Sequence, residues 1–301
     1  MALLKAEAEK LSVEQLERGV IEEFIERDAL WAFLPFMRVD SKAYVYNREG
    51  SLATGDWLGP NTDVNEAAST FSQVTAYLKI LIGDVDVDKF LDATHSDHNS
   101  QLAIQIASKA KGMARQYKEA LIKGSDGGTP ESSVQWNGLR ELALANSNEV
   151  NLGAGGTSLT LSHMDELGDL IPNGPDAYIM NSIMLRKLKA LWRSAGGNTG
   201  SMLQIENFGL PIPAHDGVPI LVNDYIVQTD GSGNDCSHIY AVRFNLTDGL
   251  HGIYGGDNAG FSVENIGTVQ NRDATRTRLK FYNGLCLKST KSLAMVKNAK
   301  V

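Results

Sequence analysis

The stretch that decides the fold runs Asp97-His-Asn-Ser-Gln-Leu-Ala-Ile-Gln-Ile-Ala-Ser-Lys-Ala-Lys-Gly-Met-Ala-Arg-Gln-Tyr-Lys-Glu-Ala-Leu-Ile-Lys-Gly124. Its apolar residues recur every three or four positions, at Leu102, Ile106, Ala110, Met113, Tyr117 and Leu121. This spacing predicts one buried stripe on an α-helix about 40 Å long, at ~1.5 Å of rise per residue. Ser96 or Asp97 can cap its start, and Gly124 can end it in a left-handed conformation. A second row is small and lets other backbone approach closely: Ala103, Ala107 and Ala114.

The overall composition is that of a folded protein. The chain has 301 residues, of which 43% are hydrophobic and 21% are charged, so it can bury the core of one large domain or of two. Its 29 glycines occur in clusters, which indicates many turns and long loops. The formal net charge of −8 argues against non-specific binding of nucleic acid by the whole surface.

The charge is distributed unevenly along the chain. Residues 1–30 contain four Lys or Arg and eight Asp or Glu, whereas residues 270–301 contain eight Lys or Arg and a single Asp. These ends either pair with each other, within or between subunits, or form two solvated faces. Cys236 and Cys286 are too few for a disulfide framework, which fits a reducing compartment. No apolar run reaches 18 residues and the acidic N-terminus is not a signal peptide, so no membrane partner is expected.

An amphipathic helix and a long hairpin precede the long helix. Residues 12–15 resemble a capping box, and the helix that follows is expected to run to about Ala32. Residues 43–48 and 71–82 have the aromatic, β-branched and alternating character of strands. The turn-rich residues 49–68 lie between them, with Trp57 in the middle. Connections this long are uncommon unless they have a function, and a tryptophan there gains most when another surface buries it.

Helices and strands alternate irregularly beyond the hairpin. Short helices are expected at 84–91, with Asp84 as the N-cap, and at 137–142, and longer ones after Ser162 and Asn181. Strands are expected at 177–180, 217–222, 238–244, 252–254, 261–266 and 278–288, the last continuing towards 293–296. Because strict βαβ alternation is missing, the fold class is α+β.

The sequence contains no recognisable catalytic or cofactor-binding motif. Residues 153–157 lack the lysine and hydroxyl residue of a phosphate-binding loop, and no Gly-x-Ser-x-Gly occurs. Helix capping explains His95 and His98 better than a metal does. The alternating Asp84, Asp86 and Asp88 lack the glycine and glutamate of a calcium loop. We therefore predict no enzyme, no cofactor and no metal site, while a site assembled from distant residues stays open.

The order of these segments resembles that of the major capsid proteins of tailed bacteriophages, which have the Hong Kong 97-like fold. Residues 25–49 resemble an N-terminal arm that leads into an extended E-loop. Residues 88–91 followed by 97–124 resemble the peripheral domain with its spine helix, and 271–287 its return strand. Four further segments resemble parts of the axial domain: residues 136–139, 178–192, 209–212 and 217–222.

This resemblance implies four parts: an N-terminal arm (1–42), an E-loop hairpin (43–82), a peripheral domain (83–131 and 269–301, with the spine helix at 97–123) and an axial domain (132–268). The alanine row of the spine helix should then face the peripheral sheet, with Lys109, Lys111 and Lys118 left for solvent or the lumen. The residues expected to contact neighbouring subunits are Phe24, Tyr44, Tyr46, Arg48, Glu49, Trp57 and Phe71.

The resemblance also implies a function. Such a protein self-assembles into the pentamers and hexamers of an icosahedral virion head, in the cytoplasm of the host bacterium. The head encloses double-stranded DNA without recognising its sequence. Scaffolding, portal and decoration proteins are the further partners expected. Because few residues precede the hairpin and the chain begins with Met1, we expect any scaffolding domain on a separate protein.

One departure and two alternatives bear on this expectation. Some family members join an E-loop lysine covalently to an asparagine of another subunit, but residues 47–71 contain no lysine, so no such crosslink is expected. The first alternative is an encapsulin, which shares the fold, encloses cargo enzymes and begins with a helix that residues 12–32 resemble. The second is a soluble α+β enzyme or ligand-binding protein.

Overall fold

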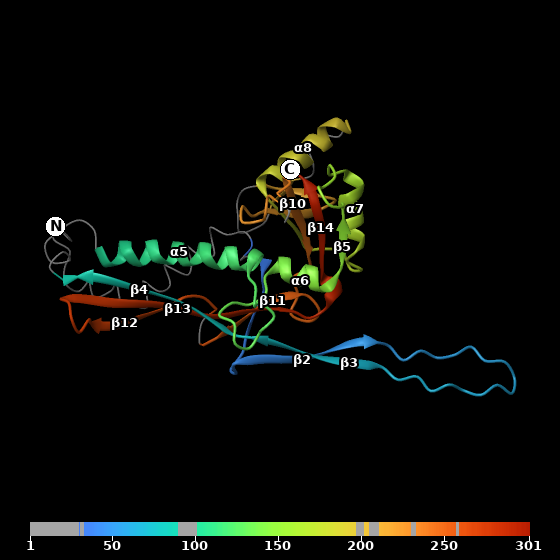
Figure 1. Cartoon of the computed structure of the whole chain (residues 1–301), viewed down its shortest axis with the longest axis horizontal. Coiled ribbons are helices and arrows are strands. Elements are labelled where there is room, and N and C mark those ends of the chain that lie inside the picture. The colour runs from blue at the N-terminus through green and yellow to red at the C-terminus, as the bar shows by residue number, and fades with distance from the viewer. Residues whose placement is uncertain are drawn as a thin grey trace.

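The computed structural model describes residues 30, 33–89, 101–196, 202–204, 211–229, 233–256 and 259–301. Figure 1 shows a rounded body from which a long blade and a thin hairpin extend in opposite directions. The helical elements are α5 Gln101–Lys123, α6 Leu139–Asn146, α7 Leu161–Asp169, α8 Ser182–Ser194 and the 3-10 turn η1 Thr290–Ser292. The strands are β1 Phe36–Arg38, β2 Ala43–Ser51, β3 Thr70–Tyr77, β4 Lys79–Asp88, β5 Glu149–Asn151, β6 Ala177–Met180, β7 Met202–Gln204, β8 Pro211–His215, β9 Val218–Val222, β10 Cys236–Val242, β11 Leu250–Gly255, β12 Ser262–Thr268, β13 Ala274–Leu287 and β14 Leu293–Lys300. None of the described helices is both long and apolar enough to cross a membrane.

Helix α5 is the long helix that the opening stretch predicts, and its large apolar residues are buried. Ile106, Met113 and Tyr117 are at most 3% exposed and pack against side chains of β4 and β13. The small residues of the second row, Ala103, Ala107 and Ala114, are only half-buried. The stripe of large residues therefore forms the fully buried side of the helix, and the alanine row lies at its border, where Ala114 packs against the same core. The predicted start of the helix, with His95 and His98, lies outside the described residues, as does most of the predicted helix 12–32.

Gly124 follows the last turn of α5, but not for the predicted reason. Its backbone is not among the residues with a positive φ. The amide of Gly138 donates to the carbonyl oxygen of Gly124 at 2.8 Å, so a second segment crosses the end of the helix. A Cβ on Gly124 would collide with the carbonyl oxygens of Ala120 and Trp136. The glycine is needed for this close approach, not for a left-handed turn.

Residues 79–88 form the strand β4, so the predicted helix at 84–91 and the capping role of Asp84 are wrong. Val85 and Val87 are buried, whereas Asp84 and Asp86 are exposed on the opposite side. This period of two is that of a strand. Leu78 lies between β3 and β4, and its amide donates to the carbonyl oxygen of Lys42. The single strand predicted at 71–82 is therefore two strands.

The long strand β13 organises a five-stranded sheet. Along one edge it pairs antiparallel with β4, from Ala274 opposite Asp88 to Asn283 opposite Lys79. Along the other edge it pairs with β12 and then β11, and β1 joins β11 in parallel. The inward row predicted for this strand is buried: Leu279, Phe281, Leu285 and Leu287. We call α5, β4, β12 and the part of β13 that pairs with β4, from Ala274 to Asn283, the blade (Figure 1).

The body surrounds a seven-stranded sheet of order β5-β14-β10-β6-β9-β8-β7. Alternate residues of the central strand β10 enter different cores. Ile239 and Ala241 pack with α7 and α8, whereas Tyr240 and Val242 pack with α6 and the end of α5. The sheet is therefore covered by helices on both faces. Because β14 belongs to this sheet and β11 and β12 to the other, the sheets divide the chain differently from the predicted ranges 132–268 and 269–301.

The helix caps of the body are partly as predicted. The side chain of Asn181 accepts a hydrogen bond from the amide of Met184 at 2.7 Å, which confirms the predicted cap of α8. Helix α7 is capped by Thr160 in a reciprocal pair with His163, not by Ser162. Both caps satisfy amides that the first helical turn leaves unpaired.

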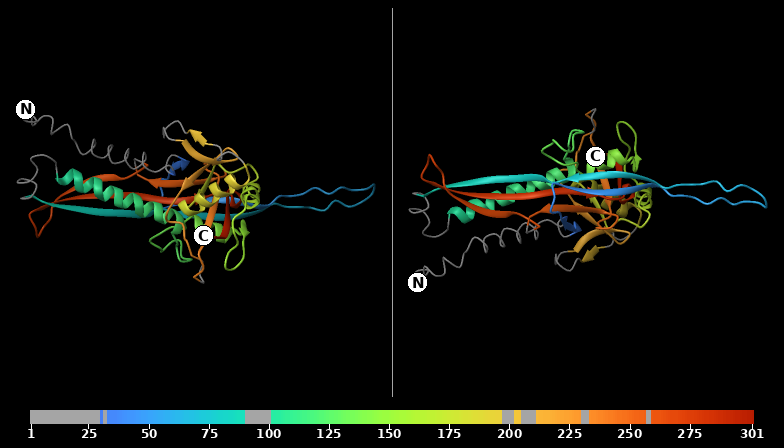
Figure 2. Two further views of the ribbon diagram at one scale, coloured as in Figure 1. Left: turned by 90° about the horizontal axis from the view of Figure 1, so that it is seen from above. Right: turned by 90° about the horizontal axis from the view of Figure 1, so that it is seen from below.

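The hairpin consists of β2 and β3, which pair from Ala43 opposite Tyr77 to Ser51 opposite Thr70. The segment 52–69 beyond these strands contains no regular strand and forms a long tip. Two views at right angles to the first show the hairpin pointing away from the blade (Figure 2). The predicted long hairpin is therefore confirmed as far as Tyr77, where β3 ends.

Candidate assembly interface

The base of the hairpin is fixed to its own chain at the end of β13. The hydroxyl of Tyr46 donates to the carbonyl oxygen of Leu287 at 2.7 Å. The guanidinium of Arg48 donates to the same oxygen at 2.9 Å and to that of Lys288 at 2.8 Å. The ammonium group of Lys288 lies 5.6 Å from the ring centroid of Tyr44. Burial raises the pKa of Tyr46, so its hydroxyl remains a donor at neutral pH.

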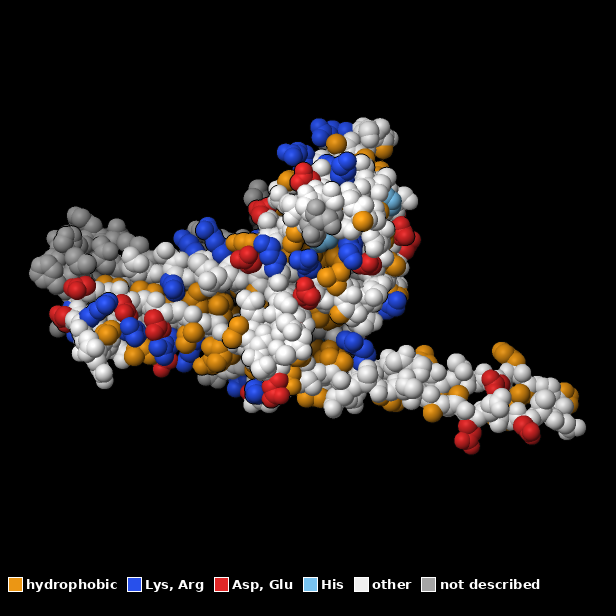
Figure 3. Space-filling view, in the orientation of Figure 1, with side chains coloured by type: hydrophobic (Ala, Val, Ile, Leu, Met, Phe, Trp, Pro, Cys, Tyr) orange, Lys and Arg blue, Asp and Glu red, His pale blue; other side chains and the backbone are white. Residues whose placement is uncertain are grey.

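The tip of the hairpin is apolar, acidic and exposed. Leu52, Trp57, Val64 and Phe71 are each at least 68% exposed, and Trp57 is fully exposed. The side-chain hydrogen bonds of residues 52–69 join these residues to one another, as between Ala53 and Ser69 and between Asn65 and Asp56. Residues 49–77 include four acidic side chains and no Lys or Arg. Figure 3 shows orange and red side chains along this extension. Such a surface is not part of the subunit's own core.

The residues predicted to contact neighbouring subunits therefore divide into two groups. Tyr44, Tyr46 and Arg48 are half-buried and hold the hairpin to its own chain. Glu49, Trp57 and Phe71 are exposed and have no such contact with the body. Phe24 lies outside the described residues.

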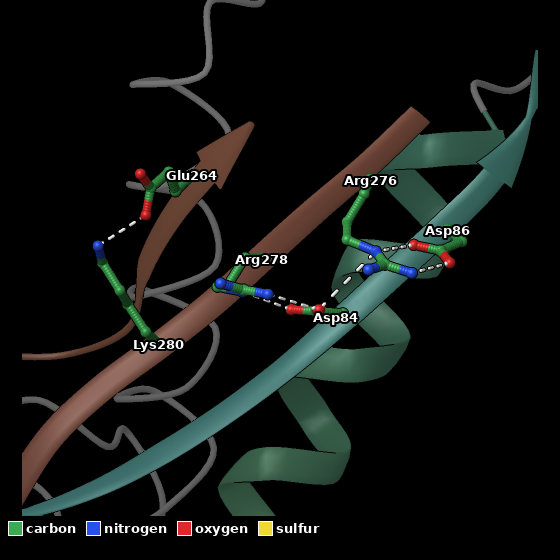
Figure 4. Close-up of polar contacts among 6 residues, drawn as sticks. All are labelled: Asp84, Asp86, Glu264, Arg276, Arg278 and Lys280. Atoms are coloured by element: carbon green, nitrogen blue, oxygen red, sulfur yellow. Dashed lines mark hydrogen bonds and ion pairs between the residues drawn. The ribbon is translucent and has the colours of Figure 1, made fainter. Parts of the chain in front are cut away.

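A ladder of ion pairs crosses the exposed face of the blade (Figure 4). Arg278 contacts both carboxylate oxygens of Asp84, at 2.7 and 2.9 Å, and Arg276 contacts both of Asp86, each at 2.7 Å. Lys280 of the same strand contacts Glu264 of β12 at 2.7 Å. These hydrogen bonds are the main reason why the pKa of each of the three carboxyl groups is lowered.

The ladder joins charges that alternate along two strands. Asp84, Asp86 and Asp88 occupy one face of β4, and Arg276, Arg278 and Lys280 occupy the matching face of β13. Sequence analysis did not pair them, although two runs of opposite charge with a period of two were the available signal. The ladder fixes the register of β4 against β13. In each of its three ion pairs the charge of the cation is balanced by that of the carboxylate.

Apolar side chains continue the same face of the blade towards the body. Ile80 is 65% exposed, Ile82 50% and Tyr282 36%, and Ile80 stands opposite Tyr282 in the β4–β13 register. A hollow of about 430 Å³ lies beside them, where the end of α5 meets the start of β4. Val134, which is 85% exposed, lines it. This face therefore offers apolar area that the described residues leave exposed.

The joint between blade and body is held by buried polar groups. The ammonium group of Lys79, which is 8% exposed, donates to the carbonyl oxygens of Pro130 and Ser133, each at 2.6 Å. Burial is the main cause that lowers the pKa of Lys79. The indole of Trp136 donates to the side chain of Asn283 at 2.7 Å. These contacts fix the loop after α5 against β4 and β13.

Several buried titratable groups lack a catalytic arrangement among the described residues. Burial raises the pKa of the Cys286 thiol to about 11, so this thiol is protonated at neutral pH and a poor nucleophile. Burial lowers the pKa of His238 and of His251 to about 4, so both rings are neutral at pH 7. Cys236 and Cys286 are both buried, and no disulfide joins them. These groups belong to the packing of the two sheets.

The sequence of the chain matches a known protein family. The profile of the phage capsid family matches residues 11–278. No curated protein sequence matches the chain.

Solved structures resemble nearly the whole chain. The holo-SrpI encapsulin complex of Synechococcus elongatus matches with a TM-score of 0.70 and 18% identity, over 100% of this chain and 97% of that one. The capsid of an empty GTA particle matches with a TM-score of 0.67 and 16% identity, over 90% of each chain. A structure from Microbacterium phage Oxtober96 matches with a TM-score of 0.65 and 13% identity, over 91% of each chain. Likeness at these identities is a likeness of fold.

Proposed function

The chain belongs to the phage capsid family and is a major capsid protein, and we propose that its copies form the pentamers and hexamers of a closed icosahedral head. Its α+β fold is of the Hong Kong 97 type, as the sequence predicts. We assign the body to the axial domain, the blade to the peripheral domain and the hairpin to the E-loop. A closed shell requires every copy to offer a surface and its complement.

The observation that carries the proposal is the hairpin, which is fixed at its base and exposes apolar side chains at its tip. Burying one large apolar side chain contributes about 1.5–3 kcal/mol. The four exposed side chains Leu52, Trp57, Val64 and Phe71 therefore offer roughly 6–12 kcal/mol of gross stabilisation to a contact. Part of this offsets the cost of ordering the tip. Repeated by every copy, such a contact stabilises a shell.

We assign the complement of the hairpin to the outer face of a neighbouring blade. The exposed Ile80, Ile82 and Tyr282 form an apolar strip there, next to the ion-pair ladder. Because the ladder satisfies its own charges, the strip meets the tip of the neighbour without an unpaired charge at its edge. Trp57 and Phe71 are the aromatic anchors of this contact.

Packaged double-stranded DNA is the second partner that we propose. The side of α5 away from the sheet carries the exposed cations Lys111 and Arg115, whereas the side chain of Lys109 lies over Gly83 of β4. Cationic side chains on a lumenal face neutralise phosphates without contacting base edges, so no sequence preference is expected. Scaffolding, portal and decoration proteins act as separate partners in this proposal, and assembly occurs in the cytoplasm of the host bacterium.

Assembly of the purified full-length chain tests the proposal. Size-exclusion chromatography and negative-stain microscopy should show closed particles for the wild type. Trp57→Ala should lower the particle yield while the circular dichroism of the subunit stays unchanged. Val222→Ala is the matched control, because Val222 is a 40%-exposed apolar residue at the end of β9 in the body. Equal particle yields for Trp57→Ala and Val222→Ala, or a monomer under all conditions, would contradict the proposal.

An encapsulin-like compartment is the second candidate function, because an encapsulin matches over 100% of this chain. The same particles distinguish the two. Phage heads contain nucleic acid, whereas a compartment contains a cargo protein. Absorbance at 260 and 280 nm and gel electrophoresis of particles from infected cells provide the measurement.

A further inference from the structure

Three potential metal ligands converge at the surface of the body. Asp165 lies on α7, His215 ends β8, and Asp216 follows in the turn to β9. The Nε2 atom of His215 lies 3.2 Å from Oδ1 of Asp165 and 3.9 Å from Oδ2 of Asp216. One ligand atom from each residue lies within 4.8 Å of the other two. This group belongs to none of the contacts that the proposed assembly uses.

The imidazole of His215 is held in place and presents its Nε2 atom to both carboxylates. The residue is only 8% exposed. Its ring lies nearly parallel to the indole of Trp192, with 6.1 Å between centroids, and the ring of Tyr178 lies at the same distance on another side. The two carboxylates are more mobile, because the side chains of Asp165 and Asp216 are 58% and 81% exposed. A rigid nitrogen ligand thus faces two adjustable oxygen ligands.

The charge of this group is unbalanced within the chain. Among the described residues, neither Asp165 nor Asp216 forms an ion pair with Lys or Arg; His215 is their only ion-pair candidate. In the absence of a cation the Nε2–H group of His215 donates to the carboxylate of Asp165, and a bound metal would take the place of this proton. A divalent cation would balance both carboxylate charges and use the nitrogen lone pair at once.

We infer that Asp165, His215 and Asp216 bind a divalent transition-metal cation, of which Zn²⁺ is the best fit. Zn²⁺ binds imidazole nitrogen and carboxylate oxygen at about 2.0–2.2 Å, which places tetrahedral ligand atoms roughly 3.4 Å apart. The distances from Nε2 of His215 to the oxygens of Asp165 and Asp216, 3.2 and 3.9 Å, are near this spacing. Rotation of the exposed carboxylates would bring the oxygen atoms to the remaining ligand positions. Water completes the coordination. Mg²⁺ and Ca²⁺ fit less well because they prefer oxygen ligands alone.

The cation would fasten α7 to the β8–β9 turn, which are about fifty residues apart in sequence. Both elements contribute to the core of the body on the face of α7 and α8. Metal binding would therefore stabilise the body and leave the hairpin and the blade unchanged.

Zinc chloride titrated into the chelator-treated full-length protein tests this inference. Calorimetry should show a saturable site, and Tm should rise by about 5 °C at a hundredfold excess over Kd. Co²⁺ should quench the fluorescence of the adjacent Trp192. Asp165→Asn and His215→Gln should each weaken binding by at least about tenfold. Asp169→Asn is the matched control, because Asp169 is an exposed carboxylate one turn further along the same helix.

Two results would overturn the inference. The first is the absence of saturable Zn²⁺ binding up to about 1 mM, a Kd that corresponds to only about 4 kcal/mol. The second is binding that Asp165→Asn leaves unchanged or that Asp169→Asn weakens equally. Because Asp165 is largely exposed, its variant should fold, so a folding defect of His215→Gln would leave the test intact.

Discussion

Acidification from pH 7 to pH 5 should weaken the subunit through two buried histidines. His238 is 6% exposed and His251 is fully buried. Burial lowers the pKa of each from 6.5 to about 4. The unfolded chain therefore binds more protons than the folded chain between these values. The contribution of each ring to stability is present above pH 6.5 and is lost as the pH falls towards 4.

The size of this effect follows from the two pKa values. The contribution of each histidine to the free energy of unfolding falls by about 2 kcal/mol between pH 7 and pH 5, so that of the pair falls by roughly 4 kcal/mol. The carboxylates of the ladder contribute little in this window, because Asp and Glu have ordinary pKa values of 3.8 and 4.5 and the ladder lowers them further. The ladder therefore adds little to the change in stability between pH 7 and pH 5, and the two histidine variants separate the part that His238 and His251 contribute.

Urea unfolding of the unassembled subunit at pH 7, 6 and 5 measures the effect. His251→Leu fills the buried site with an apolar side chain that cannot be protonated. His238→Gln retains an acceptor for the amide of Asn298, which donates to the imidazole at 3.4 Å. Each variant should remove about half of the pH dependence, whatever it does to stability at pH 7. A wild-type stability that changes by less than about 1 kcal/mol from pH 7 to pH 5 would refute the reasoning, as would variants with the wild-type pH dependence.

Three substitutions test other contacts of the fold. Arg48→Ala removes two charge-assisted hydrogen bonds to the carbonyl oxygens of Leu287 and Lys288 at the end of β13. It should cost roughly 2–4 kcal/mol in urea unfolding and raise protease cleavage at the hairpin base, with Arg48→Lys losing less. Trp136→Phe leaves the buried side chain of Asn283 without its donor and should cost about 1–3 kcal/mol, and an unchanged urea midpoint would contradict this. Arg278→Ala should destabilise the exposed ladder slightly, and the difference from wild type should shrink in 1 M salt; a salt-independent difference would argue against an electrostatic cause.

Elements with a clear local period were predictable from the sequence. The stripe of α5 and the inward row of β13 are both patterns within one element, and burial confirms them. The cap of α8 by Asn181 depends on a hydrogen bond three residues away. Local rules suffice for such features because the interacting groups are neighbours in the chain.

Features that depend on distant partners were missed or misassigned. Asp84 looked like a helix cap because its partner Arg278 is 194 residues away. The hydrogen bonds of Tyr46 and Arg48 to Leu287 and Lys288 of the same chain were missed for this reason, while their contact with a neighbouring subunit stays a prediction. Long-range pairing overrides local propensity at these positions.

The metal-ligand group illustrates the same limit. His95 and His98 are the histidines that lie near one another in the sequence. His215 instead meets Asp165 across 50 residues, because α7 packs beside the turn that carries it. A lone histidine next to a single aspartate, His215-Asp216, was the only local signal.

The central claim is that the hairpin of one copy is buried on another copy in the assembled particle. Hydrogen–deuterium exchange of residues 52–69 tests it most directly, in intact particles and in dissociated subunits. In the subunit these amides should exchange fast, because the segment contains no regular strand. In the particle we predict protection of these residues, with little change in the buried strand β10. Equally fast exchange of residues 52–69 in both states would contradict the claim.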